Sequence, residues 1–152
     1  MTSPDALENA LQRLAQRDGF QRLEASDLPA FAAAPGTAVL LLTDDPVRCP
    51  EAWDMVVVLP EALKAVPGLR PAVAAPEASR AIAAGFGITR YPALLVLRGE
   101  GAAPGHDYVG ALEGMRDWQV LVQSLATLAA APAGRRPGIG IPVLGAGPSS
   151  CH

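Results

Sequence analysis

Hydrophobic residues occur along the chain either at helical spacing or in short continuous runs, and these two patterns predict alternating helices and strands. Leucines spaced three and four residues apart predict an amphipathic helix that begins at Ser3-Pro4 and ends at Gly19. Residues 38–42 are continuously apolar, which is typical of a central strand buried on both faces. Residues 93–97 form a second apolar run of strand length. Shorter strands are expected at residues 20–23, 72–74 and 108–110.

The remaining periodic segments predict helices between and after these strands. Residues 54–66 contain three consecutive valines that alone would favour a strand, but we expect a helix kinked at Pro60. A helix from residue 76 is expected to stop at Gly85 and Gly87, both in left-handed conformations. Residues 117–130 carry one apolar stripe, and residues 27–34 form a short helix. The fold class is therefore α/β, with a central mixed β-sheet flanked by helices.

The chain of 152 residues predicts one domain at residues 1–130, followed by a flexible Pro/Gly-rich tail at residues 131–152. A net charge of −3 argues against a sequence-independent nucleic-acid binder, which needs a basic face. The apolar runs are far shorter than the roughly 18 residues of a membrane span. The first ten residues lack the pattern of a signal peptide. We therefore expect a soluble cytoplasmic protein without membrane insertion.

The segment from residue 81 to residue 99 surrounds a Tyr91-Pro92 pair. A proline that enters a strand is compatible with a cis peptide bond, which usually marks a tight turn. This segment resembles the second half of a thioredoxin-fold protein, where a helix ends in an aromatic-Gly-Ile sequence before a cis-proline that faces the active site. The resemblance implies a thioredoxin-like fold with a cis-proline at Pro92.

In such a fold the reactive site would lie in the polar loop at residues 43–51. Thiol–disulfide exchange needs two cysteines there, but the loop holds Cys49 alone and Glu51 stands where a resolving cysteine would be. Cys151 in the tail is a poor substitute, so the sequence predicts no dithiol chemistry. Arg48 would stabilise a Cys49 thiolate, whereas Asp45 and Glu51 would oppose it, which favours an incidental, partly exposed cysteine. No histidine or cysteine spacing indicates a metal site, and no cofactor is implied.

Four acidic residues crowd the same loop and the start of the next helix. These acids are either an ordinary solvated surface or a binding site for a basic peptide, since carboxylates bind guanidinium groups well. Exposed ion pairs contribute only about 0.2–1 kcal/mol, so useful affinity also needs apolar contacts, for which Trp53, Met55 and Tyr91 are available. The candidate partner-binding residues are Asp44, Asp45, Glu51, Asp54, Trp53, Tyr91 and Pro92.

Three motifs together resemble the HyaE/HupG family of hydrogenase accessory proteins, including the HoxO type. They are Asp-Pro-x-Arg-x-Pro-Glu at residues 45–51, Phe-Gly-Ile-Thr-Arg-Tyr-Pro-Ala at residues 86–93, and the segment at residues 108–118. The resemblance covers residues 3–130 and implies a non-catalytic chaperone. It would assist maturation of the small, iron–sulfur-carrying subunit of a [NiFe] uptake hydrogenase. Its implied partners are the precursor with its twin-arginine signal peptide, before export, and other hydrogenase accessory proteins.

Two alternatives remain open from the sequence. One is a monothiol redox protein that uses Cys49 to protect or reduce client cysteines, which requires an acidic thiol and a mixed disulfide with the client. The other is a thioredoxin-like scaffold for a different client.

Overall fold

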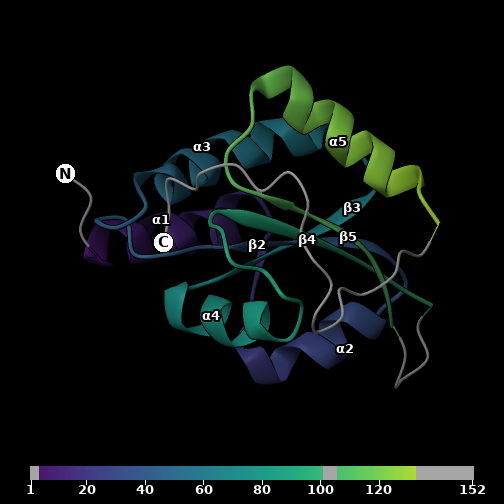
Figure 1. The fold of residues 1–152 in the computed structure, drawn as a ribbon, viewed down its shortest axis with the longest axis horizontal. Helices are drawn as coiled ribbons and strands as arrows, with labels where there is room; N and C mark the ends of the chain where they lie inside the picture. The colour runs from purple at the N-terminus through teal and green to yellow at the C-terminus, as the bar shows by residue number, and fades with distance from the viewer. Residues whose placement is uncertain (1–3, 101–105, 133–152) are drawn as a thin grey trace.

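The computed structural model describes residues 4–100 and 106–132, within which five strands form one sheet in the order β1-β3-β2-β4-β5 (Figure 1). Strand β2 pairs in parallel with β3 and antiparallel with β4, and β5 pairs antiparallel with β4. The elements in chain order are α1 (Pro4–Arg17), β1 (Gln21–Arg22), the 3-10 turn η1 (Ala25–Asp27), α2 (Leu28–Ala33), β2 (Gly36–Leu42), α3 (Pro50–Ala65), β3 (Leu69–Ala74), α4 (Pro76–Ala84), β4 (Ala93–Gly99), β5 (His106–Glu113) and α5 (Trp118–Ala130).

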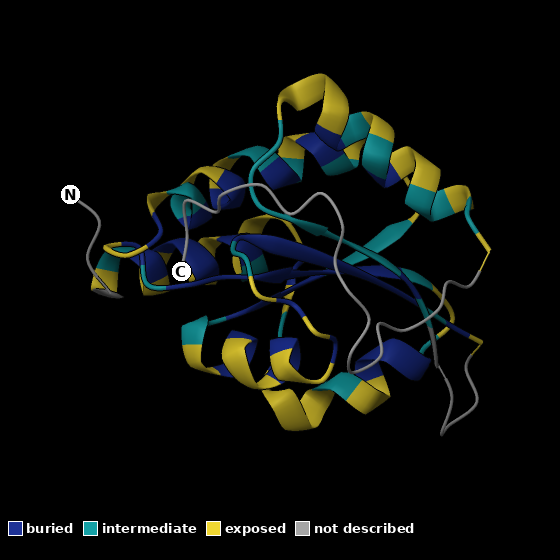
Figure 2. Cartoon of the chain, viewed as in Figure 1, coloured by how far each residue is buried: buried dark blue, intermediate teal, exposed yellow. Residues whose placement is uncertain are grey.

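Helices cover both faces of the sheet, so β2 is buried on both sides. Val39 and Leu41 belong to the core shared with α1, α3 and α5, whereas Leu40 and Leu42 belong to the core shared with α2 and α4. Figure 2 shows the central strands as buried and the outer helix surfaces as exposed. Burying one such leucine stabilises the fold by about 1.5–3 kcal/mol, which explains why this strand is an uninterrupted apolar run.

Two arginines on strands bind the carboxyl ends of helices. Arg70 on β3 donates to the carbonyls of Phe31 and Ala34 at 3.0 and 2.9 Å, at the end of α2, and its guanidinium lies 4.8 Å from the Phe31 ring centroid. Arg98 on β4 donates to the Ala131 carbonyl at 2.6 Å, after the last turn of α5. A cation suits these positions because the last carbonyls of a helix have no partner within it. Burial nevertheless lowers the pKa of Arg70.

The sequence predictions need several local corrections. Strand β5 runs from His106 to Glu113 rather than over residues 108–110, because it pairs with the whole of β4. Helix α3 begins at Pro50 rather than at residue 54, because a proline at the first helical position needs no N–H partner. Strand β3 begins at Leu69 rather than at residue 72, because it pairs with β2 from Thr37 onward. Gly87 has a positive φ of 68°, but Gly85 is helical with φ −75°, so one left-handed glycine suffices after α4.

The predicted fold class is confirmed by this mixed sheet with helices on both faces. The Tyr91–Pro92 peptide bond is cis, the isomer that the sequence predicted. Within the described residues no helix combines the length and apolar character that a membrane span requires. The predicted tail lies outside the described residues from residue 133 onward, so its flexibility stays a prediction.

Candidate functional site

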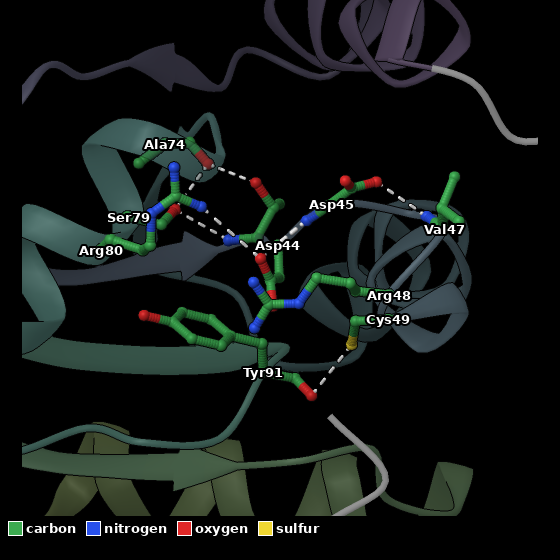
Figure 3. A network of polar contacts seen from close by, with 10 residues as sticks. Asp44, Asp45, Val47, Arg48, Cys49, Ala74, Ser79, Arg80 and Tyr91 are labelled. Atoms are coloured by element: carbon green, nitrogen blue, oxygen red, sulfur yellow. Dashed lines mark hydrogen bonds and ion pairs between the residues drawn. The ribbon is translucent and has the colours of Figure 1, made fainter. Parts of the chain in front are cut away.

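A buried hydrogen-bond network fixes the chain at the carboxyl end of the central strand β2, next to α4 (Figure 3). The Thr43 N–H donates to Ser79 Oγ at 2.8 Å, and the Thr43 hydroxyl donates to the Ala74 carbonyl at 2.7 Å. Ser79 Oγ in turn donates to the same carbonyl at 2.9 Å. Both hydroxyl residues are completely buried, so β2, β3 and α4 are tied together at this point.

Asp44 follows directly and is buried, with 1 % of its side chain exposed. Its Oδ1 accepts the Asp45 N–H at 2.8 Å and lies 3.7 Å from Arg80 Nη1. Its Oδ2 lies 3.7 Å from Arg48 Nη2 and accepts no hydrogen bond from the described residues. Asp44 is thus a compensated internal charge, which differs from the exposed rim position that the sequence indicated.

Tyr91 comes immediately before the cis-proline, and its side chain lies beside the charged group of Asp44, Arg48 and Arg80 (Figure 3). Its side chain is half-buried and packs on Cys49 and Ala52. Burial raises the pKa of the Tyr91 phenol, and the Asp44 carboxylate raises it further, while Arg80 and Arg48 act in the opposite direction. The phenol therefore stays protonated and able to donate a hydrogen bond at neutral pH.

The loop between β2 and α3 projects an apolar side chain next to a carboxylate. Asp45 Oδ1 accepts the Val47 N–H at 2.9 Å, the local hydrogen bond that aspartate commonly makes in turns. The Cys49 N–H donates to the Asp45 carbonyl at 2.7 Å and closes the turn. As a result Val47 stands 70 % exposed at the tip, beside the half-buried Asp45.

Cys49 is fully buried rather than partly exposed, which corrects the expectation from the sequence. Its sulfur is part of a disulfide bond in the structure and lies 3.3 Å from the Tyr91 carbonyl oxygen. Cys151, the other cysteine of the chain, lies outside the described residues, so its predicted weakness as a resolving cysteine stays a prediction. A monothiol mechanism needs solvent access that the described geometry of Cys49 does not provide.

The remaining predicted residues lie on the first turns of α3 and point to different surroundings. Glu51 is partly buried and Asp54 is exposed. Trp53 lines a cavity of about 220 Å³ between α1 and α3, together with Arg13. Met55 is buried in the core and is not available to a partner, which corrects its assignment as a contact residue.

The structure therefore brings together Asp44, Tyr91 and the start of α3, while Trp53 lines the separate cavity between α1 and α3. Sequence reasoning missed Ser79 and Arg80 because both reach the site from α4, more than 30 residues along the chain. It also missed the exposure of Val47, which its position inside the Asp-Pro-x-Arg turn would have indicated.

Acidic and sulfur-bearing side chains do not converge on a metal site in the part of the chain that the structure describes. The described site combines side chains that can make both polar and apolar contacts. It has one exposed apolar side chain, carboxylates of different exposure, two half-exposed arginines and a phenol.

Comparison with known proteins gives a consistent result. The family model described as hydrogenase-1 expression protein HyaE matches residues 10–121. The hydrogenase expression/formation protein HoxO of Cupriavidus necator is 37 % identical over 152 residues, covering 97 % of this chain and 91 % of that protein. The hydrogenase expression/formation protein HupG of Bradyrhizobium diazoefficiens is 33 % identical over 134 residues, with coverages of 84 % and 86 %.

Among solved structures, a mutant thioredoxin from Halobacterium salinarum superposes with a TM-score of 0.58 at 14 % identity. The match covers 76 % of this chain and 95 % of that one. At this identity the similarity establishes a thioredoxin-like fold and nothing about chemistry.

Proposed function

The chain belongs to the HyaE family of hydrogenase expression proteins, and from this membership we propose that it is a non-catalytic accessory protein of hydrogenase maturation. Its proposed client is the precursor of the small, iron–sulfur-carrying subunit of a [NiFe] uptake hydrogenase. It binds this precursor in the cytoplasm, while the twin-arginine signal peptide is still attached. Other hydrogenase accessory proteins are proposed as further partners.

The absence of a redox pair from the site loop supports binding rather than thiol exchange. A thioredoxin-like enzyme uses two cysteines two residues apart, whereas residues 43–51 contain Cys49 alone. That sulfur is fully buried, which hinders its reaction with a partner's thiol or disulfide. The loop thus lacks the two-cysteine motif of a thioredoxin, and its remaining side chains are suited to hold a partner.

The observation that carries the binding proposal is the exposed Val47 at the tip of an acidic loop. A signal peptide combines basic and apolar residues, so it needs a surface that offers both kinds of contact. Val47 supplies apolar area. Asp45 lies on the same loop, Glu51 on the first turn of α3 and Asp54 on its second turn. Asp44 is internal, and its proposed role is to hold Arg48 and Arg80 in place rather than to contact the client.

The test is a binding measurement with purified chain and a hydrogenase small-subunit precursor, with and without its signal peptide, in excess reductant. We expect binding that depends on the signal peptide and persists in reductant. Binding that disappears in reductant would instead favour the alternative function, a thioredoxin-like redox protein that acts through Cys49. Failure of the wild-type chain to bind in either condition would contradict the assignment of this client.

Charge-reversing substitutions test whether the acidic loop is the surface that binds the precursor. Asp45→Lys combined with Asp54→Lys should weaken binding of the intact precursor about tenfold, because two favourable charges become repulsive. Asp5→Lys combined with Glu100→Lys is the matched control, since it changes the net charge equally at exposed positions outside the loop. Equal affinity of the two double variants would refute the acidic-loop surface while leaving the client assignment intact.

A further inference from the structure

One carboxylate on β5 holds the segment that precedes the cis-proline. Glu113 Oε1 accepts the N–H groups of Thr89 and Arg90, at 2.9 and 3.1 Å. The next residue, Gly114, donates its N–H to the Pro92 carbonyl at 2.8 Å. The end of β5 therefore holds this segment on both sides of Tyr91.

This attachment replaces the hydrogen bonds that regular structure would provide. The Ile88 N–H still bonds to the Ala83 carbonyl of α4, but Thr89 and Arg90 belong to neither α4 nor β4, so their N–H groups have no place in a helix or sheet ladder. An ionised carboxylate is a stronger acceptor than a neutral group, and one oxygen that accepts two consecutive amides fixes the orientation of the peptide plane between them. The position of Tyr91, the next residue, follows from that plane.

Tyr91 in turn connects the segment to the candidate site. Its ring packs on Cys49 and Ala52 at the start of α3, and its phenol lies within electrostatic range of Asp44. A change in the path of residues 89–91 would therefore move the surface next to the loop that bears Val47. Glu113 is the last residue of β5 and lies at the same end of the sheet as the site, because Leu42, Ala93 and Glu113 follow one another across the paired strands.

We propose that Glu113 is a positioning residue for partner binding, which presets the Thr89–Tyr91 segment in the conformation that the client recognises. This inference rests on the proposed function. Prior organisation of a binding segment raises affinity because the partner does not have to select a minor conformation. If the competent conformation falls to about one tenth of the population, the apparent Kd rises about tenfold.

The test compares Glu113→Ala and Glu113→Gln with the wild-type chain. In Glu113→Ala, the amides of Thr89 and Arg90 should exchange with solvent at least about tenfold faster by NMR, and affinity for the precursor should fall about tenfold. Glu113→Gln keeps an Oε1 acceptor in the same place, so it should restore most of the protection and most of the affinity. Glu100→Ala removes an exposed glutamate elsewhere and should change neither quantity.

The outcomes separate this inference from the function on which it rests. A Glu113→Ala chain with fast amide exchange and wild-type affinity would overturn the positioning role while the proposed function stands. If Glu113→Gln loses as much affinity as Glu113→Ala although its amides stay protected, the charge acts directly on the partner and the positioning role is also refuted. A wild-type chain that does not bind the precursor would overturn the proposed function, and with it any role of Glu113 in this binding.

Discussion

Replacing Ser79 with alanine isolates the buried link between α4 and the end of β2. The substitution removes the acceptor of the Thr43 N–H, a bond of 2.8 Å between completely buried groups. A buried donor left without a partner costs about 1–3 kcal/mol. The Ala74 carbonyl loses one donor but keeps the Thr43 hydroxyl at 2.7 Å, so it contributes little to the loss.

The better helix propensity of alanine within α4 offsets about 0.5 kcal/mol of that loss. We therefore expect Ser79→Ala to lower the free energy of unfolding by about 1.5 kcal/mol. For a chain of this size that lowers Tm by about 5 °C, and it lowers the urea midpoint by about 0.8 M if m is about 2 kcal/mol/M. Urea unfolding followed by tryptophan fluorescence measures the change, provided that m itself is unaltered.

Ser124→Ala is the matched control, because Ser124 is partly exposed on α5 and no side-chain hydrogen bond from it appears in the described part of the chain. Its effect should stay within about 0.5 kcal/mol of the wild type. A double-mutant cycle with Thr43→Val then measures the coupling between the two hydroxyl residues, which should exceed about 0.5 kcal/mol. If Ser79→Ala is as stable as Ser124→Ala, then the Thr43 N–H finds another partner and the argument from burial is wrong.

Further predictions concern packing, helix ends and pH. Gly99→Ala should destabilise the fold by more than about 2 kcal/mol in thermal unfolding, because the added Cβ would collide with the backbone at the end of α2. Gly110→Ala should cost less, because its Cβ would meet only the flexible end of the Leu128 side chain. Arg98→Lys should reduce stability by about 1–2 kcal/mol in urea, because an ammonium cannot reproduce the fork of bonds to the end of α5. Arg22 lowers the pKa of Glu8 by a hydrogen bond, so the stability from this pair is present above the unfolded pKa and is lost as pH falls through the folded pKa. Unfolding of Glu8→Gln between pH 6 and pH 3 should therefore show a smaller loss of stability, by less than about 1 kcal/mol because the pair is partly exposed.

The core strands could be predicted from the sequence because burial on both faces requires an uninterrupted run of apolar residues. Residues buried on both faces of the sheet must all be apolar, and the runs at residues 38–42 and 93–97 show this directly. The start of α3 could not be predicted as well, because a loop of turn-forming and acidic residues continues into the helix at Pro50 without a change in composition.

The candidate site could be predicted less well from the sequence, because it depends on contacts between distant parts of the chain. Asp44 reads as a solvated loop residue until Arg80, 36 residues later, is placed beside it. The same separation hides the bond between Thr43 and Ser79. Glu113 occurs in one of the motifs shared with the family, but its bonds to the Thr89 and Arg90 amides require the pairing of β5 with β4. Local pattern gives the elements, whereas charge compensation at the site follows only from their assembly.

The bonds of Arg98 also show how far α5 must extend for this side chain of β4 to keep its acceptors. Its guanidinium holds the carbonyls of Ala129 and Ala131, and its Nε donates to Thr37 Oγ1 at 2.9 Å. A chain cut after Pro132 keeps every one of these acceptors. A chain cut at Ala126 would lose the carbonyls and leave a partly buried cation with one remaining partner. The last turn of α5 is thus tied to the sheet by a side chain of β4 that lies 33 residues before Ala131.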